Sequence, residues 1–338
     1  MPAPLKVQAA FLPGALYRQT TIVRVRKTPN PACTVEQVCA TISFGGMSAS
    51  LMRDQFERRR ITGVAAAVPQ IGQISRIRAG AVELAVILYG DHAQPLILLH
   101  GIGSRGISWL PVLEPLSARF RLVVPDLRGH GDSDKPSTGY LVADYVADLN
   151  ALIAALRLHR PVIVGHSLGA LIALAWAARH PNEAAGIVLE DPPLRSDPQA
   201  PARLDGWLAL AQTPVDEVAR RFKQEHPDWS DEACWRRAQS ITGTAPAVFT
   251  EMRTVAERGE VFVPFEQLSA VKSPILLVHG EMAAGSATHP RDVEQICAIA
   301  PRVKAVQIAQ GGHSLHRDHT EAFLTAVLPF LDECCASH

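Results

Sequence analysis

The sequence predicts an α/β protein with a mostly parallel central sheet, helices on both of its faces and one helical insertion. From residue 74 onward, short apolar runs rich in β-branched residues alternate with longer stretches whose apolar residues recur at helical spacing. A Gly-x-Ser-x-Gly turn joins one strand-like run to one helical stretch. Between about residues 194 and 270 the alternation stops, and helical stretches follow one another.

The regular part of the chain begins with three strand-like runs separated by short turns. Turns this short leave no room for a crossover helix, so the first two or three strands are expected to pair antiparallel. The later strands alternate with helices and are expected to be parallel. The predicted strands are 74–78, 82–89, 96–99, 122–125, 162–164, 186–189, 275–278 and 303–308, and the predicted helices before the insertion are 107–120, 141–158 and 168–178.

The insertion at about 194–270 carries aromatic residues among charged helical stretches, between two predicted strands of the sheet. An insertion at this point would lie over the carboxyl ends of the strands, where ligands bind in open α/β sheets. We expect it to form a helical cap, with most of its aromatic side chains packed inside the cap.

Residues 1–73 precede this pattern and show no settled period. Residues 1–60 hold nine Lys or Arg against three Asp or Glu, a net charge of +6. A basic arm for an acidic partner would have this charge, but a poorly ordered extension or a packed arm is the preferred interpretation. The catalytic domain is therefore expected to span 74–338.

The composition is that of a soluble globular protein that acts on a small molecule. Of its 338 residues 47% are hydrophobic and 20% charged, and the formal net charge is zero, which disfavours nucleic acid as a partner. No run of eighteen apolar residues predicts a membrane span. The six cysteines show no disulfide-rich spacing, which predicts a reducing compartment such as the cytoplasm. Self-association is left open.

The predicted chemistry centres on the turn Gly165-His166-Ser167-Leu168-Gly169. A strand that passes into a helix through Gly-x-Ser-x-Gly forms a nucleophile elbow, in which small flanking residues let the serine adopt strained backbone angles. The Ser167 hydroxyl would then stand above the carboxyl edge of the sheet.

A serine nucleophile needs a base and an oxyanion site. His313 follows the last predicted strand directly, so it is expected at the same sheet edge as Ser167 and serves as the predicted base. The glycine-rich turn after the third predicted strand brings the Ile102 amide to that edge. The amides of Ile102 and Leu168 are the predicted oxyanion donors.

These motifs together resemble the α/β-hydrolase superfamily over about residues 74–335. The resemblance rests on His100-Gly101, the segment 126–133 that looks like D-x-R-G-H-G-x-S, the serine elbow and Gly312-His313. It implies the superfamily's fold, a serine–acid–histidine order along the chain and no cofactor.

The acid departs from the usual pattern of the superfamily. Most relatives carry it a few residues after the strand at 275–278, where this chain has Gly280-Glu281-Met282-Ala283. A minority carry it after the strand that follows the elbow helix, which here offers Glu190 and Asp191. Side chains alternate along a strand, so only one of the two can face His313. Asp191 is the predicted acid, with Glu281 and Glu190 as alternatives.

The predicted function is hydrolysis of a carboxylic ester, lactone or thioester through an acyl-enzyme intermediate. The alternatives are C–C bond hydrolysis or other non-ester chemistry on the same fold, and a catalytically weak, receptor-like binding protein. The run 313–319 comes close to the H-x-H-x-D-H pattern of binuclear metallohydrolases, but Ser314 interrupts it, so no metal is predicted.

An apolar pocket is expected over Ser167 and would favour a neutral substrate. Only two basic residues, Arg105 and Arg317, flank the predicted active-site loops, and each is expected to pair with a surface carboxylate instead. The predicted pocket residues are Gly101, His166, Trp109, Trp207 and Trp235.

Overall fold

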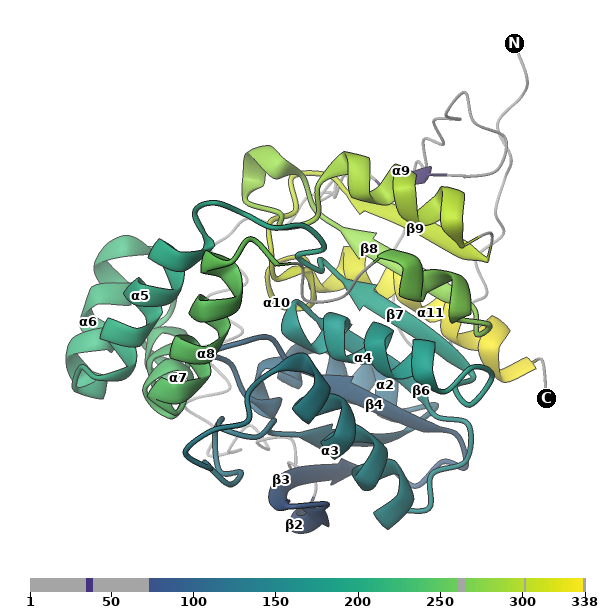
Figure 1. Cartoon of the computed structure of the whole chain (residues 1–338), viewed down its shortest axis with the longest axis horizontal. Coiled ribbons are helices and arrows are strands. Elements are labelled where there is room, and N and C mark those ends of the chain that lie inside the picture. The colour runs from purple at the N-terminus through teal and green to yellow at the C-terminus, as the bar shows by residue number, and fades with distance from the viewer. Residues whose placement is uncertain (1–34, 39–72, 261–264, 301, 337–338) are drawn as a thin grey trace, which may run out of the picture.

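A nine-stranded sheet forms the centre of the computed structural model, which describes residues 35–38, 73–260, 265–300 and 302–336 (Figure 1). Its strand order is β1-β9-β8-β7-β6-β4-β5-β3-β2. The strands are β1 (Val35–Val38), β2 (Gln73–Ala79), β3 (Val82–Tyr89), β4 (Pro95–Leu99), β5 (Arg121–Pro125), β6 (Val162–His166), β7 (Gly186–Glu190), β8 (Ile275–His279) and β9 (Val303–Ile308).

Among the described strands of the sheet, β3 alone runs opposite to the others. β3 pairs antiparallel with both β2 and β5, whereas every pair from β5 through β4 to the β1 edge is parallel. The predicted antiparallel start is confirmed for β2 and β3. The third strand, β4, runs parallel to its neighbours instead, because β5 occupies the place beside β3.

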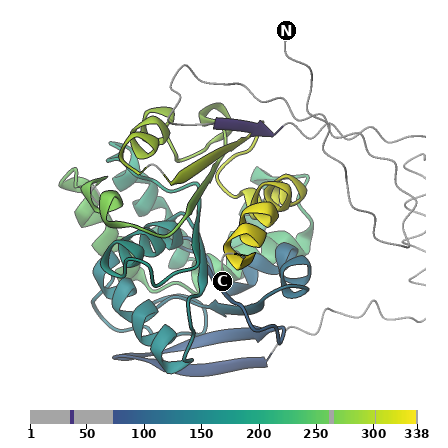
Figure 2. The same cartoon turned by 90° about the vertical axis from the view of Figure 1, so that its right-hand side faces the viewer.

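Helices cover both faces of the sheet (Figure 2). One face packs against α3 (Val142–Ala155), α4 (Leu168–Arg179) and α9 (Pro290–Ile299), and the other against α2 (Leu110–Ser117) and α11 (Thr320–Ala336). Every residue of β4, β6, β7 and β8 is buried, as strands covered on both faces require. The predicted α/β class is confirmed. The predicted helix at 107–120 is divided into the 3-10 turn η1 (Gly106–Trp109) and α2.

The interval between β7 and β8 holds four helices, which we call the insertion helices. They are α5 (Ala200–Ala211), α6 (Val215–Glu225), α7 (Asp231–Thr242) and α8 (Pro246–Glu257), and Figure 1 shows them grouped beyond one end of the sheet. Phe222 and Phe249 are buried, so aromatic side chains hold the group together. Ala245 N donates a 2.7 Å hydrogen bond to the Gly129 carbonyl in the loop after β5, which places the helices at the carboxyl ends of the strands.

The N-terminal segment contributes one described strand. β1 pairs in parallel with β9 at the edge of the sheet, with Val35 opposite Ala305. The rest of the predicted extension 1–73, apart from Gln73 in β2, lies outside the described residues. Its independence from the catalytic domain therefore stays a prediction.

The described helices and cysteines bear on two predictions, the absence of a membrane span and a cytoplasmic location. None of the described helices combines the length and the apolar character that a membrane crossing needs. Cys297 in α9 is disulfide-bonded, whereas Cys234, Cys334 and Cys335 are free thiols. The cytoplasmic location that was inferred from cysteine spacing stays a prediction.

Candidate active site

Ser167 is the only residue between β6 and α4, and its backbone is strained. Its φ and ψ angles are 52° and −113°, a conformation that L-residues rarely adopt. A Cβ atom on Gly165 would lie 2.2 Å from the Gly169 carbonyl oxygen, and one on Gly169 would lie 2.2 Å from the Leu99 carbonyl oxygen. Larger residues at these two positions would therefore clash with the backbone, so the glycines permit the turn.

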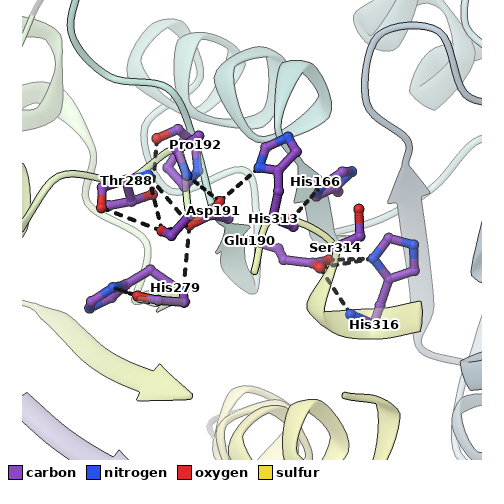
Figure 3. Close-up of polar contacts among 12 residues, drawn as sticks. His166, Glu190, Asp191, Pro192, His279, Thr288, His313, Ser314 and His316 are labelled. Carbon is purple, nitrogen blue, oxygen red and sulfur yellow. Dashed lines mark hydrogen bonds and ion pairs between the residues drawn. The ribbon is translucent and has the colours of Figure 1, made fainter. Parts of the chain in front are cut away.

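The residues predicted as base and acid meet beside this turn. His313 Nδ1 lies 2.7 Å from Asp191 Oδ2 (Figure 3). Ser167 N donates a 2.9 Å hydrogen bond to the carbonyl of Glu190, the residue before Asp191. His166, the residue before Ser167, contacts the His313 carbonyl oxygen through Nε2 at 2.8 Å. The ends of β6, β7 and the loop after β9 thus bring Ser167, Asp191 and His313 together.

The Asp191 carboxylate is fully buried and is held by the loop after β8. Its oxygens accept hydrogen bonds from Ser286 Oγ at 2.5 Å and from the Ala287 amide at 2.7 Å. Burial alone would raise the pKa of Asp191, but the contact with His313 and these donors lower it below the usual value of 3.8. Asp191 is therefore an anion near neutral pH.

The loop after β8 plays a part that the sequence analysis did not foresee. In most relatives this loop supplies the acid, whereas here it donates hydrogen bonds to an acid from β7. Glu281, an alternative acid, makes no hydrogen bond to His313 within the described part of the chain. The sequence offered no signal for Ser286 and Ala287, because their role depends on where the loop folds.

Glu190, the other alternative acid, faces a different histidine. His316 Nδ1 lies 2.8 Å from both Glu190 carboxylate oxygens, and the His316 amide donates to Oε1 at 2.9 Å. The His316 ring also stacks on Trp109, with ring centroids 4.0 Å apart. Figure 3 shows Asp191 and Glu190 directed toward different histidines, as the alternation of side chains predicted.

The histidine-rich run 313–319 does not gather into a cluster of metal ligands. His316 is buried against Glu190, and His313 is paired with Asp191. The described residues contain no group of three or more His, Cys, Asp or Glu in metal-binding geometry.

Residues 100–103, which we call the oxyanion turn, pack directly against the elbow. A Cβ atom on Gly101 would lie 2.9 Å from His166 Nδ1 and 3.1 Å from Ser167 Cβ, so only glycine allows this approach. Leu168 is the first residue of α4, and its amide has no acceptor within the helix. Ile102 lies next to Gly101 in the turn. Leu168 therefore follows Ser167 directly, and Ile102 follows the glycine that packs against Ser167; their role as oxyanion donors stays a prediction.

Two buried histidines hold the oxyanion turn in place. The His100 ring contacts the Gly101 carbonyl through Nδ1 and accepts from the Leu127 amide through Nε2. His130 accepts the Gly103 amide through Nε2 at 3.2 Å. Burial lowers the pKa of His100 to about 4 and that of His130 to about 3, so both rings are neutral.

The predicted pocket aromatics are placed differently from one another. Trp109 is fully buried and stacked on the His316 ring, so it does not line an open pocket as expected. Trp207 packs toward Phe249 among the insertion helices, with ring centroids 6.4 Å apart. Trp235 is 41% exposed. The structure does not bring these three rings together over Ser167.

Comparison with known proteins reveals similar chains. The sequence is 30% identical over 261 residues to the N-formylmaleamate deformylase of Pseudomonas putida, covering 76% of this chain and 95% of that one. It is 28% identical over 267 residues to the 2-(acetamidomethylene)succinate hydrolase of Mesorhizobium japonicum, covering 76% and 94%. The crystal structure of E-2-(acetamidomethylene)succinate hydrolase superposes with a TM-score of 0.68 at 25% identity, covering 77% and 99%.

A family model agrees with these similarities. The model for the alpha/beta hydrolase fold matches residues 94–320, a stretch that runs from the start of β4 past His313. It therefore includes the elbow, the end of β7 and the loop after β9. The resemblance inferred from the motifs is confirmed, and this chain is a hydrolase that belongs to the α/β-hydrolase fold family.

Proposed function

We propose that the chain is a serine hydrolase that cleaves the acyl–nitrogen bond of a small amide-type substrate, with Ser167 as the nucleophile. The observation that carries this proposal is the 2.7 Å contact between His313 Nδ1 and the buried Asp191 carboxylate, beside a serine in a strained turn. The two relatives are named for an N-formyl and an acetamido compound. These names favour the non-ester alternative over the predicted ester, lactone or thioester.

The geometry supports a two-step mechanism. Asp191 holds the Nδ1 proton of His313, so Nε2 can accept the proton of the Ser167 hydroxyl. The serine oxygen attacks the acyl carbon, and the amides of Ile102 and Leu168 stabilise the oxyanion. His313 then protonates the leaving nitrogen, the C–N bond breaks, and the acyl group stays on Ser167.

Water completes the proposed reaction. His313 removes a proton from a water molecule, which attacks the acyl-enzyme and releases the carboxylic acid. The proton passes back to the serine oxygen as the ester bond breaks. Every proton transfer is served by His313, so the mechanism requires no metal or cofactor.

The test compares bond types and labels the nucleophile. We would measure kcat/KM for N-formyl and N-acetyl amides and for p-nitrophenyl esters, and treat the protein with a fluorophosphonate probe. We expect turnover of the amides, and labelling that is lost in Ser167→Ala. Labelling with turnover of esters alone would return the function to ester hydrolysis. Neither labelling nor turnover would favour the receptor-like binding protein.

A further inference from the structure

Two arginines lie beside the proposed catalytic residues. Arg237 belongs to α7, and its Nη1 donates a 2.5 Å hydrogen bond to the carbonyl oxygen of Gly103 in the oxyanion turn. Arg317 belongs to α10 (Leu315–Asp318), four residues after His313, and its Nη2 donates to Ser314 Oγ at 2.5 Å. One arginine therefore reaches the site from the insertion helices, and the other from the loop of the proposed base.

The positive charge of Arg317 acts both on Arg237 and on His166, the residue before Ser167. Burial, and then the positive charge of Arg317, lower the pKa of Arg237 to about 10. After burial and the neighbouring histidines, Arg317 also contributes to the lowered pKa of His166, the residue before Ser167. The Arg237 guanidinium lies 5.7 Å from the centroid of the Phe222 ring, which covers it with an apolar surface. By their contacts, Arg237 touches the oxyanion turn and Arg317 touches the loop that carries His313.

Neither arginine forms an ion pair with an Asp or Glu in the described parts of the chain. The Nε atom of Arg317 is buried without any hydrogen-bond partner there. A partly buried cation without a counter-ion costs free energy, which an anionic ligand would offset. Three other half-buried or buried arginines have carboxylate partners: Arg105 with Asp132, Arg128 with Asp148 and Arg195 with Asp292. Arg121 and Arg160 also have no carboxylate partner in the described chain, but they lie at the amino ends of β5 and β6, at the opposite edge of the sheet from Ser167.

We infer that Arg237 and Arg317 bind a carboxylate of the substrate, which makes the enzyme selective for N-acyl compounds that carry an acid group. This inference rests on the proposed function. A planar guanidinium can donate two parallel hydrogen bonds to a carboxylate, and two guanidiniums from different elements would fix its orientation. The inferred substrate is therefore an anion, whereas the sequence analysis expected a neutral substrate. Arg105, the other predicted flanking arginine, is engaged by Asp132 and takes no part.

A purely structural role for Arg237 is the rival explanation, since its bond to Gly103 ties α7 to the oxyanion turn. A structural tie would serve all substrates equally, whereas a carboxylate site serves only acids. The test therefore uses a matched pair: N-formylsuccinamate, which carries a carboxylate, and N-formylsuccinamide, in which a neutral carboxamide replaces it.

For wild type we expect kcat/KM to favour the acid about 100-fold or more, because each charged hydrogen bond contributes about 10- to 100-fold. Arg237→Met and Arg317→Met should each lower kcat/KM for the acid by about 10- to 100-fold. The loss for the neutral amide should be smaller, so that the ratio of kcat/KM for the acid to kcat/KM for the amide falls about 10-fold or more in each variant. Arg236→Met is the matched control, because Arg236 adjoins Arg237 but is exposed and pairs with Glu232.

Equal losses for both substrates, or a wild-type enzyme without preference for the acid, would overturn the inference. Fluorophosphonate labelling of Ser167 separates this outcome from failure of the proposed function, which would abolish labelling and all turnover. Calorimetry of succinate binding to the Ser167→Ala protein needs no turnover. Binding that weakens about 10-fold or more when Arg317→Met is added supports the carboxylate site, and unchanged binding contradicts it.

Discussion

Two carboxylate–histidine pairs leave the end of β7 in different directions. Asp191 pairs with His313, and the preceding residue, Glu190, pairs with His316. Both carboxylates are fully buried, and both contacts are 2.7 to 2.8 Å long. The pairs differ in their histidines, because the His313 side chain is 34% exposed and the His316 side chain only 1%.

Both histidines have a carboxylate partner, so the pairing does not distinguish a catalytic base from a structural histidine. The distinguishing property is whether solvent and substrate can reach the ring. The second ring nitrogen of His316, Nε2, is buried without a hydrogen-bond partner in the described chain, and the ring is stacked on Trp109. It can reach neither solvent nor substrate. His313 is partly open, and a base must exchange protons with both. We therefore expect the Asp191 pair to govern rate and the Glu190 pair to govern stability.

The largest expected effect follows from Asp191→Asn. The amide cannot hold His313 in the tautomer that accepts the serine proton, so kcat should fall roughly 10⁴-fold, as it does for the equivalent change in a serine protease triad. Steady-state kinetics on the preferred substrate would measure this. Glu281→Gln, at the place where most relatives carry the acid, should change kcat little. A larger loss in Glu281→Gln would move the acid back to the loop after β8.

The matched change in the second pair, Glu190→Gln, should act on stability. Glutamine offers one acceptor oxygen where the carboxylate offers two, and its amide group would face Nδ1 of His316. We expect the free energy of unfolding to drop by about 1–3 kcal/mol, the cost of an unsatisfied buried polar group. Urea unfolding would measure this drop. A loss of kcat as large as that of Asp191→Asn would show that the two pairs do not divide their tasks.

Buried histidines without a carboxylate partner in the described chain, His100 and His130, should make the stability of the protein depend on pH in a different range from Asp191. The pKa values of His100 and His130, about 4 and about 3, lie below the usual 6.5, so folding favours their neutral forms. Their contribution to stability is complete above pH 6.5 and is lost as the pH falls toward 4 and then 3. Asp191 has a lowered carboxyl pKa, so its contribution persists until the pH falls below its usual 3.8.

Between pH 6 and 5 the free energy of unfolding should therefore decline, with a slope approaching about 1.4 kcal/mol per pH unit for each of these two histidines. Urea unfolding at several pH values would measure the slope. His130→Asn keeps a polar side chain but removes one titrating ring, so its slope should be smaller than that of wild type by up to about 1.4 kcal/mol per pH unit. The slope should not vanish, because burial also lowers the pKa values of His166 and His279. An unchanged slope in this variant would show that other groups control acid stability.

Sequence reasoning identified most of the fold, because strands buried on both faces read as continuous apolar runs between helical stretches. It also brought Ser167, His313 and Asp191 to one edge of the sheet, since they follow the ends of parallel strands. The partner of Glu190 was not predictable, because it depends on how the loop after β9 packs. The place of Arg237 was hidden for the same reason: the helices of an insertion give no register against the sheet.

The smallest expected effect comes from Ser286→Ala, which tests whether the loop after β8 sets the Asp191 pair apart. Ser286 Oγ is one of several donors to Asp191, and the Ala287 amide and His313 remain in the variant. Loss of one hydrogen bond to a charged group should lower kcat about tenfold, far less than Asp191→Asn. The control is Ser273→Ala, a buried serine whose hydroxyl donates to the Ala184 carbonyl away from the site. Equal kinetics in the two variants would show that the loop only fills space beside Asp191, whereas a selective loss in Ser286→Ala would make it part of the machinery that orients His313.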